Sequence, residues 1–432
     1  MLRKNLKRIL LPGLLIFLII LFPGIAIAEN SDQPIQYYLK LASVNNPDII
    51  SYQCKVNATY DVLRQNYTNY NLQITNTTTD SKSASSGVGQ TDLYSSQLNA
   101  SLLLFDSGKT HYAIESARQT YYQNNFNLYT TQQNVYITII SSYYDFLKNK
   151  KLVEVSAENL KYLEKKLDQI TEFFKNGIRP KIDVTTASVE LYNEKITSLD
   201  FRNQSLTAYE QLRKSAGTTD NMPKPKMISA VTDYKITLSD ALNCAYNERR
   251  DLKSAIANAQ SAYFLIKQTR VANSPVINLI SNYNWQGVNT NPLPNSSQIG
   301  IQMTWNIFNG GLTDWQVNQL VENYKDLSSQ VVNTRLQIQK DVSDAYYTMD
   351  KNYETLGLYD AKLDQATENL DLANQRYTLG VGDITELTNA QTAFFRSQAE
   401  KINSLYEFLK SKAQLEKTMG LDLFMLYSTG GK

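Results

Sequence analysis

The chain matches itself at one fixed offset, and this repetition constrains its fold more than any other feature. Gly108 corresponds to Gly311 and Gly177 to Gly380, in each case 203 residues later, the difference between 108 and 311. The same offset relates Asp48–Ile49 to Asp251–Leu252, Tyr143–Tyr144 to Tyr346–Tyr347, Ala187 to Ala390, Gln211–Leu212 to Gln414–Leu415 and Gly217 to Gly420. A constant spacing over so many positions predicts two tandem copies of one structural unit.

We expect a short extended connector between the two copies. The repeated residues run roughly from 33 to 217 and from 235 to 420. We therefore divide the chain into a first structural repeat at residues 29–220, a connector at 221–236 and a second structural repeat at 237–432. Pro223 and Pro225 lie in the connector and favour extended backbone there.

Each copy is predicted to contain a helix, a pair of strands and a long helical hairpin. The strands are expected roughly at residues 70–105 and 275–308, with polar loops at 75–91 and 286–297 inside each pair. The pattern then stays helical for about 68 residues, on the order of 100 Å, and a helix of about 34 residues returns. The fold class is therefore mixed, mainly α with a small β part.

The distal part of each long helix carries an apolar stripe that is typical of a coiled coil. The stripe steps by three and four residues through Leu160, Leu163, Leu167, Ile170 and Phe174, and through Leu363, Ala366, Leu370, Ala373 and Tyr377 in the second copy. This spacing places all members of a stripe on one side of the helix. The two helices of each hairpin are thus expected to pack against each other.

The strands alternate apolar and polar residues, which leaves two interpretations open. Residues 301–308 (IQMTWNIF) and 98–105 (LNASLLLF) fit a half-buried strand of a soluble sheet, or a strand with lipid on one side and water on the other. Four strands cannot close a membrane barrel, because about eight is the minimum and an open edge in lipid is forbidden. Membrane strands would therefore require a dimer with eight strands or a trimer with twelve, and the long helices would project into the periplasm.

The N-terminal residues predict export. Residues 1–28 combine a basic start, an apolar run and the Ala26-Ile27-Ala28 cleavage pattern, as a signal peptide does. The segment holds four of the 43 Lys and Arg residues, leaving 39 against 41 Asp and Glu, so nothing indicates nucleic-acid binding. One histidine, His111, and two cysteines, Cys54 and Cys244, give no support for a catalytic site, a metal site or a cofactor. Whether the two thiols pair is left open.

The motif at residues 102–110 (LLLFDSGKT) ends like a phosphate-binding loop but lacks the glycine such a loop requires. That position is Leu103, and the second copy replaces the lysine as well. The motif lies where a strand becomes a long helix. Gly108 and Gly311 are expected to allow the bend, and Asp106 and Asn309 to cap the helices that follow.

These motifs together resemble the TolC-like outer-membrane channel family over essentially the whole mature chain. The resemblance rests on Asn46-Pro47, on the junctions at 105–108 (FDSG) and 308–311 (FNGG), and on the tips at 174–184 and 377–387. It implies a homotrimer with a 12-stranded β-barrel in outer-membrane lipid and a helical tunnel in the periplasm of a Gram-negative bacterium. Expected partners are a periplasmic adaptor (membrane fusion) protein and an inner-membrane pump or ABC exporter.

The resemblance also assigns candidate roles at the hairpin tips. Gly177, Ile178, Gly380 and Val381 are candidates for adaptor contact, although each glycine could equally serve only the turn. Asp183 and Tyr377 match the acceptor and donor of a latch between hairpins, and Glu386 and Asn389 fall at positions that line the aperture. The arginine that often completes the latch is replaced here by Gly382, which puts the charged part of the latch in doubt. Asp183 and Glu386 could instead be ordinary helix-start residues.

The function expected from the sequence is an exit duct without catalytic activity, serving efflux or type I secretion. A periplasmic coiled-coil structural protein or adhesin is the alternative, and it would explain the helices but not the paired strands. An enzyme is the least favoured class, since no nucleophile and base are apparent.

Overall fold

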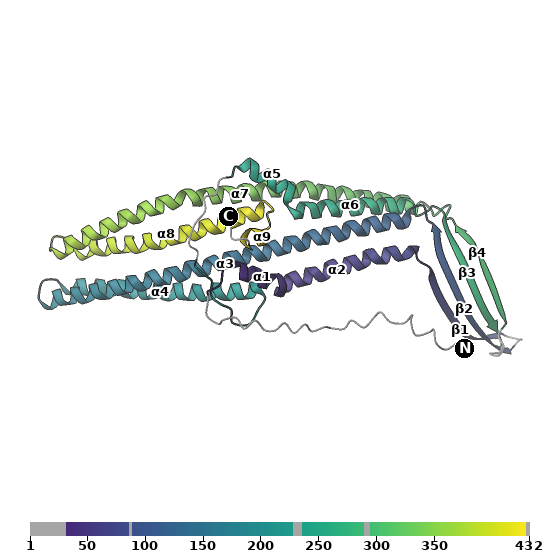
Figure 1. The fold of residues 1–432 in the computed structure, drawn as a ribbon, viewed down its shortest axis with the longest axis horizontal. Helices are drawn as coiled ribbons and strands as arrows, with labels where there is room; N and C mark the ends of the chain where they lie inside the picture. Colours follow the sequence, from purple (N-terminus) through teal and green to yellow (C-terminus); the bar gives the residue numbers. More distant parts are fainter. Residues whose placement is uncertain (1–31, 86–88, 228–235, 289–293, 429–432) are drawn as a thin grey trace.

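The computed structural model describes residues 32–85, 89–227, 236–288 and 294–428. The molecule is elongated, with a sheet at one end and the tips of two helical hairpins at the other (Figure 1). The first copy comprises α1 (Ile35–Asn45), α2 (Pro47–Tyr67), the short 3₁₀ helix η1 (Thr68–Tyr70), β1 (Gln73–Ser85), β2 (Gly89–Phe105), α3 (Lys109–Lys175) and α4 (Lys181–Ala216). The second comprises α5 (Leu238–Glu248), α6 (Arg250–Arg270), β3 (Val276–Gly287), β4 (Asn295–Thr304), α7 (Leu312–Thr378), α8 (Ile384–Thr418) and α9 (Leu423–Ser428).

Apart from η1 in the first copy and α9 in the second, the two copies have the same order of helices and strands, and the predicted fold class is confirmed. Helices α3 and α7 each have 67 residues, and both ends of α7 lie 203 residues after those of α3. Each long helix pairs with a shorter antiparallel helix, α4 or α8 (Figure 1). In the predicted stripes Leu163, Ile170, Ala366, Ala373 and Tyr377 are buried, whereas Phe174 at the tip is exposed.

The four strands form one antiparallel sheet in the order β1-β2-β3-β4. Strand β2 pairs with β3, although the two belong to different copies, with Leu102 opposite Leu279. A register shift between Leu103 and Phe105 marks a bulge in β2 just before the helix. β1 and β4 are the edge strands within the chain.

The predicted strand limits were wrong in two places. Most of the polar residues expected in the loop at 75–91 belong to β1 and β2, because their backbones pair from Gln73 opposite Ser101 up to Ser85 opposite Gly89. β4 begins earlier than expected and ends at Thr304, which is opposite Val276 at the start of β3. Residues 305–308 lie beyond that last partner and are therefore not part of the strand.

The first strand-to-helix junction is fixed by the side chain of Asp106. This buried carboxylate accepts hydrogen bonds from the backbone nitrogens of Gly108 (3.0 Å) and Thr110 (2.6 Å). It thereby satisfies two of the amides that the first turn of a helix leaves without partners. Gly108, with φ of 85°, occupies a left-handed conformation that favours glycine. Lys109, the lysine of the motif that resembled a phosphate loop, is the exposed first residue of α3.

At the second junction the expected cap is not formed in the same way. The Asn309 amide donates to the side chains of Thr313 (2.7 Å) and Asn273 (3.1 Å) instead of accepting from the first turn of α7. The prediction that Asn309 caps this helix was therefore wrong. Gly310 and Gly311 both have positive φ here, so the bend itself is made by two glycines.

The largest apolar core lies at mid-length. There the C-terminal end of α4 meets the start of α2, and the C-terminal end of α8 meets the start of α6; we call these two places the mid-length joints. In the first copy the Asn46 side chain accepts from Asp48 and Ile49 at the start of α2 and donates to the Ser215 carbonyl of α4 (2.8 Å). A Cβ on Gly217 would come within 2.5 Å of the Asn45 carbonyl oxygen, so the joint admits no side chain there. Helices α1 and α9 pack into this core (Figure 1).

None of the described helices is both long enough and apolar enough to cross a bilayer. Cys54 on α2 and Cys244 on α5 are both free thiols. The predicted signal peptide and residues 228–235 of the predicted connector lie outside the described residues.

We expect Asp106→Ala to destabilise the protein by about 1–2 kcal/mol, because two backbone amides lose their acceptor in the first turn of α3. Asp106→Asn keeps an oxygen acceptor and should cost less. Thermal and denaturant unfolding of the purified protein would measure both. Asn309→Ala is the matched variant at the other junction and should cost less than Asp106→Ala; an equal loss would contradict the capping role assigned to Asp106.

Candidate functional site

Both hairpins end in turns that require glycine. Gly177 follows α3 with φ of 71°, and Gly380 follows α7 with φ of 81°. In each turn the glycine nitrogen donates to the carbonyl three residues earlier, Phe174 (3.0 Å) or Tyr377 (3.2 Å). A glycine in the left-handed conformation commonly ends a helix. Each tip turn is therefore determined by its own few residues, without a contribution from the other hairpin.

The outer ends of the two tips are apolar and exposed. Ile178, Leu379 and Val381 expose 63%, 78% and 69% of their surfaces, and Ile182 in the first turn of α4 is also exposed. We call these four residues the apolar tip patch. Gly177 and Gly380 lie beside it, so the residues expected to contact an adaptor are accessible in the single chain.

Behind the apolar tip patch the two hairpins meet in a small core of their own. Its buried members come from both copies: Ile170, Ala187, Ala373, Tyr377, Ile384, Leu387 and Ala390. This tip core is separate from the large core at mid-length. Three of its seven buried members are alanines, so it contains little apolar volume and allows the helices to approach closely.

A buried hydrogen bond joins the two hairpins at the tip core. The Tyr377 hydroxyl on α7 donates to the Asp183 carboxylate on α4 at 2.8 Å, and the two residues are only 1% and 4% exposed. Burial raises the pKa of the Tyr377 phenol well above its ordinary value; Asp183 adds to this and Arg179 opposes it. The phenol therefore stays protonated and remains a donor throughout the physiological pH range.

Two cations of the first hairpin also reach Tyr377 and its neighbour. The Arg179 guanidinium lies over the Tyr377 ring, 4.1 Å from its centroid, and donates to the Tyr377 backbone carbonyl. The buried Lys166 ammonium donates to the Asn374 side chain, one turn earlier on α7. Burial lowers the pKa of Lys166 from its usual value.

The two predicted aperture residues lie on the exposed side of α8. Glu386 forms an ion pair with Arg376 within its own hairpin, with 2.9 Å between Nε and Oε1. Its backbone nitrogen donates to the Asp383 carboxylate at 2.7 Å, which makes Asp383 the cap of α8. Asn389 is exposed one turn further along. The structure thus brings Asp183 and Tyr377 together but places Glu386 and Asn389 on a different surface.

Gly382 occupies a confined position. A Cβ added there would lie 3.1 Å from both Arg376 Cβ and the Tyr377 backbone nitrogen. A larger side chain at this position would require the end of α7 to shift.

Sequence reasoning missed Arg179, Lys166 and Asp383. The offset of 203 residues relates Arg179 to Gly382, and this difference between the copies was the only sequence signal for the arginine. Contacts between the hairpins join positions that are not equivalent in the repeat, so the offset itself could not have paired Arg179 with Tyr377.

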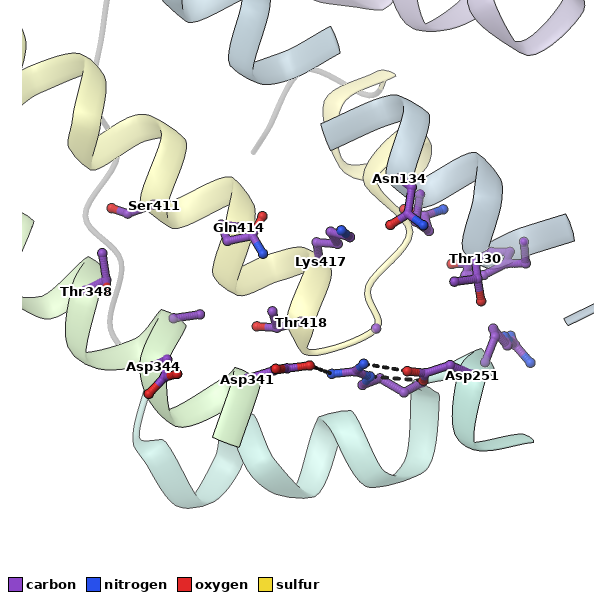
Figure 2. A pocket seen from close by; sticks show the side chains of 16 residues that line it. Thr130, Asn134, Asp251, Asp341, Asp344, Thr348, Ser411, Gln414, Lys417 and Thr418 are labelled. Atoms are coloured by element: carbon purple, nitrogen blue, oxygen red, sulfur yellow. Dashed lines mark hydrogen bonds and ion pairs between the residues drawn. The ribbon is translucent and has the colours of Figure 1, made fainter. Parts of the chain in front are cut away.

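A charged pocket lies at the mid-length joint of the second copy. The Arg249 guanidinium donates to Asp341 at 3.3 Å and to Asp251 at 3.0 Å and 2.5 Å. Figure 2 labels Asp341 and Asp251, and its dashed lines mark these contacts. Arg249 lies 203 residues after Asn46 and is its counterpart in the repeat. The second copy therefore has ion pairs at this position, whereas the first copy has neutral hydrogen bonds. Burial and the nearby Arg249 lower the pKa of Lys417, while Asp341 and Asp251 oppose this. With both charge signs balanced, this pocket fits a structural joint.

Comparison with known proteins places this geometry in a family. A sequence model described as "Outer membrane efflux protein" matches residues 38–218 and 241–421. The chain therefore belongs to the outer membrane efflux protein family, which confirms the predicted TolC-like membership and the predicted outer-membrane location.

Individual relatives are distant in sequence and close in fold. The outer membrane protein TolC of Salmonella enteritidis is 22% identical over 323 residues, which cover 70% of this chain and 65% of TolC. A crystal structure of CusC superposes with a TM-score of 0.83 at 17% identity, covering 91% of this chain and 94% of CusC. The Campylobacter jejuni CmeC outer membrane channel gives 0.81 at 14% identity, covering 90% and 86%. The alignment thus spans less than two thirds of TolC.

We expect Leu387→Ala to loosen the tip core without unfolding the molecule. Leu387 is fully buried, so the substitution removes about 2–5 kcal/mol of local packing in a cluster that is otherwise small. Hydrogen exchange should speed up at the two tips and stay unchanged at mid-length. Leu379→Ala, at an exposed position, is the control, and equal changes in the two variants would contradict a separate tip core.

Proposed function

We propose that the chain forms the outer-membrane exit duct of a tripartite efflux pump or a type I secretion system. The observation that carries this proposal is a four-stranded sheet with two open edges, continuous with helices on the order of 100 Å long. Ile299, Ile301 and Met303 alternate along β4 and are exposed in the single chain. Such a sheet needs lipid on its apolar face and neighbouring strands at its edges.

The neighbouring strands would come from further copies of the chain. Three copies supply twelve strands when β4 of one copy pairs with β1 of the next, and this arrangement leaves no open edge. Exposed apolar residues on α4 support contact along the helices as well, since they recur at steps of three, four and seven: Ile182, Val189, Tyr192, Ile196, Leu199 and Leu206. A homotrimer uses both flanks of every copy.

The tips would form the closed periplasmic end of this duct. The Tyr377–Asp183 hydrogen bond and the tip core hold the second hairpin against the first, so opening requires both to separate. Glu386 and Asn389 would face the aperture from α8. The apolar tip patch would meet a periplasmic adaptor, and the energy for transport would come from an inner-membrane pump or ABC exporter, because the duct is passive and not an enzyme.

Single-channel recording of the purified protein in a planar lipid bilayer tests the proposed function. We expect discrete conductance steps and a trimer in detergent. A monomer that gives no conductance steps would refute the duct and favour the periplasmic structural or adhesin alternative. Deleting the gene and measuring both drug susceptibility and secreted proteins would separate efflux from protein export.

The same recording tests the gate. Tyr377→Phe and Asp183→Ala should each raise conductance, because each removes one partner of the buried hydrogen bond between the hairpins, a contribution of about 1–3 kcal/mol. Asp168→Ala is the control, since it removes an exposed carboxylate from α3. If both gate variants conduct like the wild type and the control, the bond does not hold the entrance closed.

A further inference from the structure

Arg179 makes two contacts with the opposite hairpin, both of them to Tyr377. Its guanidinium stacks on the ring at 4.1 Å and donates to the backbone carbonyl of the same residue. The residue lies in the turn between α3 and α4, directly before Pro180 and two residues before Lys181, the first residue of α4. A single planar cation thus engages both the side chain and the main chain of Tyr377.

The carbonyl that Arg179 contacts is chemically special because it lies in the last turn of α7. Helix α7 ends at Thr378, and carbonyls in the last turn have no partner further along the helix. The Tyr377 carbonyl oxygen accepts one hydrogen bond from the Gly380 nitrogen within the turn, at 3.2 Å, and accepts a second one from the Arg179 guanidinium. The negative end of the helix dipole favours a cation at this place. Arg179 therefore caps α7 from another hairpin.

The second hairpin does not place a side chain of its own at the equivalent position. The repeat offset relates Arg179 to Gly382, where a Cβ would already press against Arg376 and Tyr377. The cation between the hairpins is thus supplied by the first copy. Arg376, the basic residue in the last turn of α7, pairs with Glu386 inside the second hairpin.

Lys166 holds the same end of α7 from a second direction. Its ammonium donates to Asn374 and lies 5.6 Å from the centroid of the Tyr377 ring. Three residues of the first hairpin thus surround Tyr377. Asp183 accepts from its hydroxyl, Arg179 contacts its ring and its carbonyl, and Lys166 contacts the preceding turn of α7. No comparable set reaches from the second hairpin to the first among the tip contacts of the described residues.

We propose that Arg179 is a latch residue that holds the second hairpin closed by capping the C-terminal end of α7. This role rests on the proposed duct, because a latch has meaning only where the tips close a passage. Movement of α7 away from the first hairpin must break the guanidinium contacts and the Tyr377–Asp183 bond in one event. Arg179 thereby restores the charged part of the latch that Gly382 removes.

Single-channel recording of Arg179→Ala in the full-length protein tests the latch. Loss of a charge-assisted hydrogen bond should shift the closed-to-open equilibrium about tenfold toward open. Arg179→Lys keeps the charge but loses the planar stack, so its shift should be smaller. Lys181→Ala removes an exposed cation two residues away and should conduct like the wild type.

A double-mutant cycle identifies the partner of Arg179. Tyr377→Ala removes the ring, so Arg179→Ala should add less in that background than in the wild type. Tyr377→Phe keeps both the ring and the carbonyl, and there the effect of Arg179→Ala should persist. Full additivity with Tyr377→Ala would contradict the contact as the source of the effect.

Hydrogen exchange separates a latch from a role in folding the first tip alone. A cap in trans predicts faster exchange in Arg179→Ala at amides 376–382 of the second tip, with an unchanged melting temperature of the trimer. Faster exchange confined to residues 174–183 would overturn the proposal.

The failure of the latch can be told from the failure of the duct. A wild-type protein without conductance refutes the duct. A conducting protein in which Tyr377→Phe raises conductance and Arg179→Ala does not refutes only the latch.

Discussion

Along the helices the two copies meet where α3 packs against α6 and α8, and at the sheet they meet through the hydrogen-bonded pairing of β2 with β3. This pairing joins strands that are far apart in sequence and fixes their register, with Leu102 opposite Leu279. β2 leads through a glycine bend into α3, and β3 pairs with β4, which leads through a second glycine bend into α7, so both helices of 67 residues start from the same sheet. At the far end Tyr377 of one hairpin lies against Asp183 of the other. Equal helix lengths are essential to this, because one extra turn in either helix would move its tip by about 5 Å.

Sequence alone predicted the parts of the fold that depend on local pattern. The repeat, the glycine bends and the limits of the long helices follow from residues whose preferences act within a few positions, such as Gly108 and Gly380. The predicted strand limits were less accurate, because a strand extends only as far as its backbone has a pairing partner. Residues rich in Ser and Thr belong to β1 and β2 because their backbones pair with each other. Residues 305–308 lie outside the sheet because β3 has no residues opposite them.

The tip contacts show the limit of the same reasoning. Resemblance singled out Asp183 and Tyr377, and the structure brings them together. Arg179 could not be placed, because its interaction depends on how two hairpins cross, and neither hairpin alone encodes that crossing. The pair joins a turn residue to the counterpart of Phe174, so comparison of equivalent positions does not reveal it.

The two copies have kept one backbone plan and acquired different chemistry. At mid-length Asn46 makes neutral hydrogen bonds where Arg249 makes ion pairs with Asp251 and Asp341. At the tips the first copy supplies the carboxylate and the cations, and the second supplies the tyrosine and the free helix end. The two copies therefore have the same backbone arrangement but contribute different partners to the contacts between them.

The contacts that join Asp183, Arg179 and Lys166 to α7 are complete within a single chain. In the proposed trimer each chain would therefore bring its own full set of these contacts, and the entrance would carry three copies of them. A substitution at one of these positions would then act three times around the same opening.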